Sequence, residues 1–421
     1  MNAYRQQVLN YLDANSDELF ALLSKLISFD SQNYVSRGNE RLCAEYLADV
    51  YRDMGLETEL YMPDDVPGMT AHPAYNQNRG TDSRPNVDGI MYGSDRDARI
   101  LVAAHTDTMP VGEPGEWFVN PFGGEIRDGK LYGLGAGDNK EGLAAAVYAV
   151  KALQNAGAPI RKTIVLNAYC DEEYGGGGGA LAACLRHNYE VIVNLDGGNF
   201  EIWRSALGGG CFSIEITKDK STDTATQTVE ALYYVLQRLE QMGELRRAEL
   251  RSNPLYVGSD MERAAFRLHG FHCGNAGSDL NRGSIAFAIY SDKTKEEIDR
   301  EFGRLNAELF ETLAKNGFHV GPFVPESRFF EYREAAPDSM ALTLIKKCTK
   351  EIIARPVKVC GACLSDLSIF LAFGCAISFS FGVLRDFSLP GGAHQPNEYV
   401  ECNQALQHTK ALALFLLDYC G

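Results

Sequence analysis

Residues 100–107 read Ile-Leu-Val-Ala-Ala-His-Thr-Asp, a short apolar run that ends directly in a histidine and an aspartate. Five consecutive apolar residues are typical of a strand that is buried on both faces, as in a parallel sheet. Imidazole and carboxylate groups can bind a metal or transfer a proton. This stretch therefore predicts a buried strand with chemically useful side chains at its carboxyl end.

Three other apolar runs show the same arrangement. The run 163–169 leads to Asp171-Glu172-Glu173, the run 191–195 leads to Asp196, and the run 375–381 leads to a loop that carries His394. In open α/β sheets, ligands bind outside the carboxyl ends of the strands. We therefore expect these acids and histidines to meet in one pocket.

The elements around these runs favour a layered α/β domain. Helical patterns cover 4–28, 40–54 and 139–156, and a further apolar run spans 86–92. The segment 63–85 is rich in proline, glycine, asparagine and aspartate, which predicts a loop. This loop is long enough to suggest a role at the rim of a site. Strands that bracket helices argue for a largely parallel central sheet.

The pattern changes between about 208 and 323. A strand at 211–217 precedes a helix at 224–243, and a strand at 284–290 precedes a helix at 294–315 that opens with a capping-box pair, Thr294 and Glu297. We expect a catalytic α/β domain, residues 1–207 plus 324–421, interrupted by a smaller α+β lid or dimerisation domain, residues 208–323.

Composition excludes several classes of function. With 40 basic and 56 acidic residues, the formal charge is −16, so nucleic acid and anionic membranes are poor partners. No run approaches the ~18 apolar residues of a membrane span. The 11 cysteines form no regular framework. They favour reduced thiols and a cytoplasmic location.

The expected pocket would suit metal-assisted hydrolysis. Two imidazoles with three or four carboxylates fit a pair of Zn²⁺ ions, with Co²⁺ or Mn²⁺ as alternatives. A carboxylate can bridge two such ions, and a glutamate outside the ligand set can act as general base. Because adjacent residues point differently from the backbone, Glu172 and Glu173 can divide these roles.

The ordered blocks resemble the M20 metallopeptidases, which include dipeptidases, tripeptidases, carboxypeptidases and acyl-amino-acid deacylases. The blocks that carry the resemblance are Ala104–Asp107, Trp117, Pro121-Phe122, Asp128–Gly133, Gly137–Gly142, Asp171–Glu173, Asp196 and Gly392–Glu398. A single His-x-Asp would be weak evidence, whereas the complete set in family order is strong evidence.

The resemblance implies a role for each residue of the set. It assigns a bridging ligand (Asp138), two ligands for one metal (His105, Asp196), two for the other (Glu173, His394), a general base (Glu172) and an aspartate that orients the first histidine (Asp107). Two simpler roles stay open. Asp138 could cap a helix with Glu141 as its capping-box partner. Asp171 is better explained as a turn or support residue than as a ligand.

The inserted segment matches the family less well. The lid histidine that many relatives carry is missing from Ile216–Ser221, and the expected arginine is missing from Ala286–Ser291. The segment 274–282 loosely resembles a substrate-contacting segment. Its Asn275 and Arg282 are candidate donors to the substrate, and His269 or His272 could take the place of the lid histidine.

The resemblance also suggests substrates and partners. An aspartate at position 196 resembles the aminopeptidase and dipeptidase branch, so a small peptide is the favoured substrate. An N-acyl amino acid deacylase, similar to acetylornithine deacetylase or succinyl-diaminopimelate desuccinylase, and a carboxypeptidase are alternatives with the same mechanism. The family also implies a homodimer through the inserted domain.

Two hypotheses come from other classes. Gly175 to Ala180 nominally fits a dinucleotide-binding glycine pattern, but the preceding acidic triplet would repel a pyrophosphate. A metal-binding protein without activity would explain the missing lid histidine, although the general base and all five ligands are present.

Overall fold

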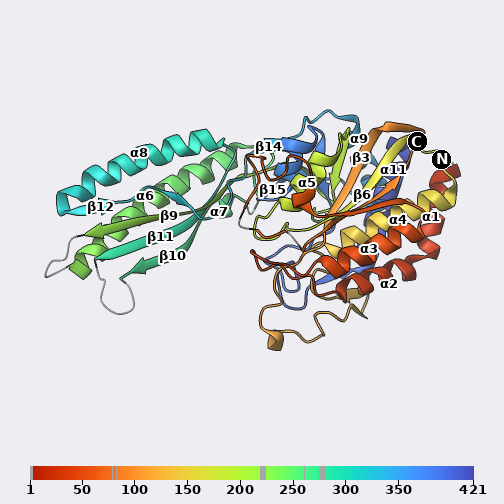
Figure 1. Ribbon diagram of the computed structural model, residues 1–421, viewed down its shortest axis with the longest axis horizontal. Coiled ribbons are helices and arrows are strands. Elements are labelled where there is room, and N and C mark those ends of the chain that lie inside the picture. The colour runs from red at the N-terminus through yellow and green to blue at the C-terminus, as the bar shows by residue number, and fades with distance from the viewer. Residues whose placement is uncertain (1–2, 78, 82, 219–223, 260, 275–280) are drawn as a thin grey trace. The chain divides into compact units, whose positions relative to one another are not determined.

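The computed structural model describes residues 3–77, 79–81, 83–218, 224–259, 261–274 and 281–421. The chain forms two compact units, labelled by element in Figure 1. The first unit comprises Met1–Arg204, Glu334–Ala362 and Ile369–Gly421, and the second comprises Ser205–Arg333 and Cys363–Ser368. No helix in the described part of the chain is long and apolar enough to span a membrane.

The first unit is built on a nine-stranded sheet with the order β1-β2-β6-β3-β7-β16-β8-β14, to which β15 is added through β8. The strands are β1 (Glu57–Tyr61), β2 (Asn86–Met91), β3 (Asp95–His105), β6 (Lys162–Tyr169), β7 (Val191–Asn194), β8 (Ile202–Ala206), β14 (Arg333–Glu334), β15 (Val359–Ala362) and β16 (Ser378–Phe381). The four central strands, β6, β3, β7 and β16, pair in parallel, while β1, β2 and β8 pair antiparallel. The α/β fold class expected from the sequence is confirmed.

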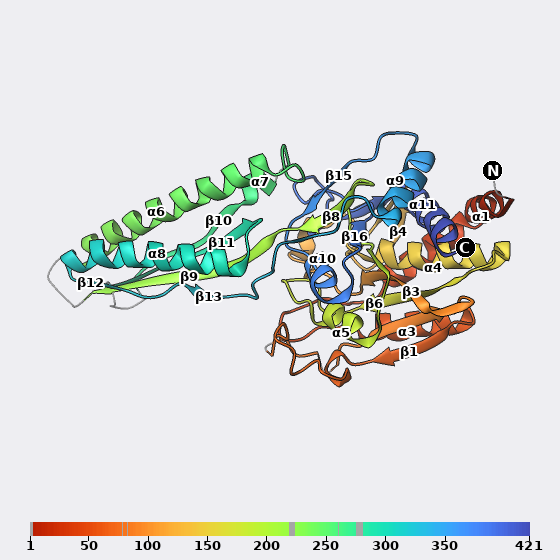
Figure 2. The ribbon, with the colours of Figure 1, turned by 90° about the horizontal axis from the view of Figure 1, so that it is seen from above.

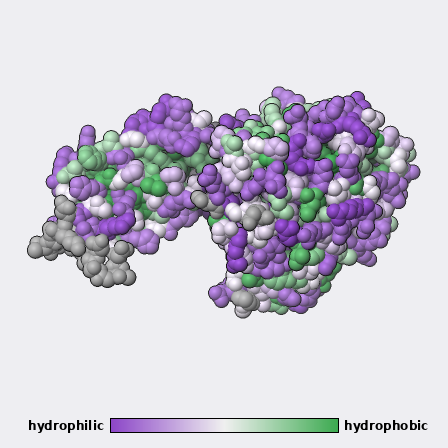
Figure 3. Space-filling model, in the orientation of Figure 1, coloured by the Kyte–Doolittle hydropathy of each residue, from purple (hydrophilic) through white to green (hydrophobic). Residues whose placement is uncertain are grey.

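Helices cover this sheet. They are α1 (Ala3–Ala14), α2 (Ser16–Ile27), α3 (Arg41–Asp53), α4 (Lys140–Ala156), α5 (Gly178–Arg186), α9 (Met340–Ile353) and α11 (Cys402–Cys420). The single turn α10 (Leu367–Ile369) begins in the second unit and ends in the first. Buried α4 packs against α1, α2, α11 and β3, and Figure 2 shows α1, α4 and α11 close together. Figure 3 shows mainly hydrophilic residues on the visible surface of this unit, in keeping with the charge of −16.

One expectation is wrong in detail. The sequence predicts a single helix over 4–28, but the helix breaks at Asn15, where φ is −116° and ψ is 22°. The Asn15 side chain donates a hydrogen bond to the carbonyl of Tyr11 at 2.7 Å. Such local bonding by asparagine competes with continuation of a helix.

The second unit contains an antiparallel sheet with the order β10-β11-β9-β12, to which β13 is added through β9. Its elements are β9 (Gly208–Lys218), α6 (Thr224–Ser252), α7 (Met261–Ala264), β10 (Phe266–Cys273), β11 (Arg282–Ser291), α8 (Lys295–Leu313), β12 (Phe318–Val320) and β13 (Val324–Pro325). Helices α6 and α8 pack on the sheet through a core that includes Leu232, Phe287 and Phe302. The predicted capping box is present: the Thr294 hydroxyl accepts from the Glu297 amide at 3.3 Å, and the Glu297 carboxylate accepts from the Thr294 amide at 2.9 Å.

The long loop between β1 and β2 sends two arginines into the interior of the first unit. Arg84 is fully buried; its Nε donates to Glu40 Oε1 at 2.8 Å, and its Nη1 lies 2.9 Å from Asp171 Oδ1. Arg79 donates to Asp171 Oδ1 at 2.7 Å and to the carbonyl of Glu173 at 2.7 Å. This network fixes the turn after β6, and it gives Asp171 the support role expected from the sequence.

Arg84→Met should destabilise the first unit by about 3–5 kcal/mol, because it leaves the carboxylates of Glu40 and Asp171 buried without this cation. The matched control is Arg52→Met, which removes an exposed ion pair with Asp49 and should cost no more than about 1 kcal/mol. Urea unfolding followed by tryptophan fluorescence reports this unit alone, since both tryptophans, Trp117 and Trp203, lie in it. Equal losses in the two variants would contradict the importance of the network.

Candidate metal centre

The parallel strands bring the predicted ligands together. His105 is the last residue of β3, Glu173 lies in the turn after β6, and Asp196 follows β7 by two residues. Two sets of ligand atoms result, one from His105, Asp138 and Asp196 and the other from Asp138, Glu173 and His394. Within each set, all ligand atoms lie within 4.8 Å of one another.

Asp138 is common to both sets. Its Oδ1 lies 3.0 Å from Nε2 of His105, and its Oδ2 lies 3.2 Å from Nε2 of His394. Two ligands of one tetrahedral zinc ion, each about 2.0–2.1 Å from the metal, would be about 3.3 Å apart. The distance from each Asp138 oxygen to its imidazole is therefore close to the distance between two ligand atoms that bind the same ion. This carboxylate could thus bridge two ions.

The ring of His105 is held in one orientation. Its Nδ1 donates to the backbone carbonyl of Asp107 at 2.9 Å, while the Asp107 carboxylate is 3.7 Å away. A carbonyl oxygen only accepts, so Nδ1 carries the proton and Nε2 is left to bind a metal. Burial lowers the pKa of His105, but Asp138, Glu172 and Asp107 raise it well above its usual value.

The carboxylate of Asp107 organises the neighbouring turn. It accepts hydrogen bonds from the backbone amides of Glu172 at 3.1 Å and Glu173 at 2.9 Å, and from the side chain of Asn33 at 2.7 Å. Burial opposes ionisation, but His105, Arg84 and these donors leave the pKa of Asp107 below its usual value. Asp107 therefore stays charged and fixes both glutamates.

In the second set, Asp138 and Glu173 are buried, whereas His394 is exposed. His394 Nε2 lies 3.1 Å from Glu173 Oε2, and the Met109 amide donates to Glu173 Oε1 at 3.2 Å. Burial and the charge of Asp138 raise the pKa of Glu173, and they raise that of Asp196 to about 7. Buried carboxylates of this number are costly without cations. The donor set fits divalent metal ions, which would neutralise this excess of negative charge.

Asn139, which follows Asp138, connects the start of α4 with the end of β7. With its amide oriented to satisfy both groups, it donates to the carbonyl of Leu195 at 3.1 Å and accepts from the amide of Asp196 at 3.3 Å. Asn139 also occupies the N-cap position of α4, with no capping bond from its side chain. The capping-box alternative for Asp138 is wrong, because its carboxylate faces the imidazoles and Glu141 pairs instead with His408 at 2.9 Å.

Glu172 differs from its neighbour. It is half-buried, and neither set of ligand atoms includes it, although its charge acts on His105. The turn therefore directs Glu173 to His394 and leaves Glu172 outside both sets of ligand atoms.

The expected substrate contacts lie in the second unit or outside the described residues. Asn275 is outside the described residues. Arg282 begins β11, where its Nε donates to Glu215 at 2.6 Å. His269 Nε2 lies 3.9 Å from the thiol of Cys211, and His272 is exposed on β10.

Three of the supporting residues, Asn33, Arg79 and Glu398, had no role predicted from the sequence. Asn33 and Arg79 lie in loops without a local motif, so only the folded chain connects them with Asp107 and Glu173. Glu398 lies in the block that contains His394, and this proximity to a predicted ligand was an available signal.

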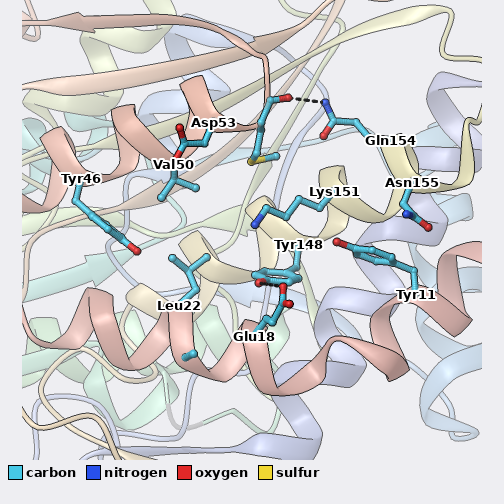
Figure 4. Close-up of a pocket in the computed structure, with 12 residues that line it drawn as sticks. Tyr11, Glu18, Leu22, Tyr46, Val50, Asp53, Tyr148, Lys151, Gln154 and Asn155 are labelled. Atoms are coloured by element: carbon cyan, nitrogen blue, oxygen red, sulfur yellow. Dashed lines mark hydrogen bonds between the residues drawn. The ribbon is translucent and has the colours of Figure 1, made fainter.

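Two other features are unsuited to the chemistry. A third set of potential ligands, Glu59, Asp88 and His187, already has a cation beside it, since Arg186 Nε lies 3.3 Å from Asp88 Oδ2. A pocket of about 690 Å³ lies among α1, α2, α3 and α4 (Figure 4). In it, Tyr148 donates to Glu18 at 3.2 Å and Lys151 points into the open space, but no predicted ligand lines it.

Known proteins match this chain either over part of its length or over nearly all of it. A succinyl-diaminopimelate desuccinylase of Rhodospirillum centenum is 40% identical over 106 residues, which are 25% of this chain and 27% of that protein. An N-formyl-4-amino-5-aminomethyl-2-methylpyrimidine deformylase of Halalkalibacterium halodurans is 22% identical over 99% of this chain and 97% of its own length. The solved structure of the di-peptidase Dug1p from Saccharomyces cerevisiae has a TM-score of 0.73 at 15% identity, covering 100% of this chain and 99% of its own.

A sequence model of Peptidase family M20/M25/M40 matches residues 101–418, a region that contains every predicted metal ligand from His105 to His394. Since this match spans well over half of the chain, the protein is a member of Peptidase family M20/M25/M40, the metal-dependent hydrolases of C–N amide bonds.

Proposed function

We propose that this protein hydrolyses an amide bond in a small substrate at a centre of two divalent ions, with zinc as the first choice of metal. The observation that carries the proposal is the position of Asp138, whose two oxygens face two different imidazoles at 3.0 and 3.2 Å. Asp138 would bridge the ions, His105 and Asp196 would complete one site, and Glu173 and His394 would complete the other.

Bound divalent ions supply Lewis acidity, which lowers the pKa of water and polarises an amide carbonyl. The protein's own part is proton transfer and orientation. Glu172 takes a proton from the attacking water and gives it to the leaving amine. Asp107 holds Glu172 in place through the backbone amide of that residue.

Two substrate classes have support. Removal of a small acyl group from an amine is the first candidate, because the deformylase that aligns with 99% of the chain acts on an N-formyl compound. Cleavage of short peptides with a free amino terminus is the second, because Asp196 resembles the aminopeptidase and dipeptidase branch. Removal of an acyl group is favoured, because the support for the peptidase rests on Asp196, and Asp differs from Glu by only one methylene group.

We also propose a role for the second unit and a cellular location. The second unit would contribute substrate contacts, with Arg282 as its described candidate and Asn275 outside the described residues, and would form a homodimer. A cytoplasmic location is supported by the cysteines, because all 11 are free thiols.

Substrate class is tested by a panel of N-formyl amines, N-succinyl amino acids, dipeptides and N-blocked dipeptides, each with Zn²⁺, Co²⁺ or Mn²⁺ and with a chelator. We expect chelator-sensitive release of formate or succinate. Faster cleavage of free-amine dipeptides would instead support the peptidase branch, and faster cleavage of N-blocked dipeptides would support a carboxypeptidase.

Glu172→Gln should lower kcat by about 10²–10⁴-fold while both metal ions remain bound, because the general base is removed and the ligands are not. Turnover and metal content by mass spectrometry check this. Glu296→Gln, on the exposed surface of α8, is the control. Full activity in Glu172→Gln would eliminate this residue as the base, and loss of a metal ion would make it a ligand.

Metal binding at pH 7 should release at least one proton. In the metal-free protein, burial works against the charge of His394, but Asp138 and Glu173 raise its pKa to about 11, so a metal must displace a proton. Affinity for the metal should therefore fall as the pH falls. Calorimetry in two buffers with different ionisation enthalpies measures the released protons, and identical apparent enthalpies in both buffers would contradict the expectation.

A further inference from the structure

Glu398 is a buried carboxylate that faces the loop before Asp138. Only 2% of its surface is exposed. Its Oε1 accepts from the backbone amides of Gly137 at 2.8 Å and Asp138 at 3.0 Å, and its Oε2 accepts from the amide of Gly135 at 3.0 Å. Both carboxylate oxygens therefore accept hydrogen bonds from the backbone of one short stretch, residues 135–138.

No cationic group forms an ion pair with Glu398 among the described residues. The nearby ammonium of Lys140 donates instead to the carbonyl of Phe29 at 2.9 Å. A buried carboxyl group without an ion pair is stabilised mainly by its hydrogen bonds. For Glu398, those bonds come from the loop that carries the shared ligand Asp138.

A small sheet fixes the register between Glu398 and this loop. In it, β17 (Tyr399–Glu401) pairs with β5 (Lys130–Tyr132), which pairs with β4 (Glu125–Arg127). Just beyond this pairing, the Gly133 amide donates to the backbone carbonyl of Glu398 at 2.9 Å. The same segment carries both Glu398 and His394. It therefore supplies the imidazole of the second ligand set and also the carboxylate that accepts from the backbone amide of Asp138.

We propose that Glu398 is a positioning residue for the metal centre, which holds the backbone at Asp138 so that its two oxygens remain divided between His105 and His394. This inference rests on the proposed two-metal function. A glutamine at this position would present an NH₂ group to at least one backbone N–H, so the loop would lose an acceptor and meet a donor. Groups that orient metal ligands typically contribute 10–100-fold to metal affinity or activity.

The test compares Glu398→Gln with Glu401→Gln, a half-exposed glutamate on the same segment that lies 3.9 Å from Lys130. The measurements are Co²⁺ affinity, Co²⁺ stoichiometry and the visible absorption spectrum of bound Co²⁺, which reports ligand geometry. We expect Glu398→Gln to bind Co²⁺ about 10–100-fold more weakly with an altered spectrum. Glu401→Gln should match the wild type in all three measurements.

Far-UV circular dichroism of the metal-free proteins separates mispositioning from unfolding. If Glu398→Gln does not fold, Glu398→Asp replaces it, since that variant keeps the charge but withdraws the carboxylate by one methylene. Wild-type affinity and spectrum in the folded variant would overturn the inference alone. A wild-type protein that binds no Co²⁺ would overturn the proposed function, and the inference with it.

Discussion

The parallel pairing of β6, β3, β7 and β16 is the constraint on which the site depends. Parallel strands end at the same edge of a sheet, so side chains distant in sequence meet there without any local motif to join them. His105 ends β3, Glu173 follows β6 and Asp196 follows β7. Only Asp138 and His394 need separate loops to reach this edge.

The same pairing concentrates negative charge, which the protein balances in two ways. Beneath the turn after β6, Arg79 and Arg84 both pair with Asp171, and Arg79 also donates to the backbone carbonyl of Glu173. At the edge itself, Asp138, Glu173 and Asp196 lie together with the imidazoles of His105 and His394. The arginines therefore balance the charge of the supporting residue Asp171. The charge of the candidate ligands would instead be balanced by bound metal ions, which can take part in chemistry.

The central strands and the meeting of the candidate ligands at one edge were predictable, because both the apolar runs and the polar residues that follow them are visible in the local sequence. An apolar run followed by an acid or a histidine, as in 100–107, carries both signals at once. The split of the first helix at Asn15 was missed because its apolar spacing continues across the break. The contact between His105 and the carbonyl of Asp107 was not predictable, because the sequence does not indicate whether a backbone or a side-chain oxygen lies nearer to the ring.

The order of the ligands along the chain has a consequence for biosynthesis. His105, Asp138 and Asp196 all precede the second unit, whereas His394 follows it. A growing chain on the ribosome therefore completes one set of ligands long before the other can exist. During the synthesis of roughly the second half of the protein, Asp138 has a single imidazole partner, and the second set of ligand atoms can form only when the segment with His394 has been added.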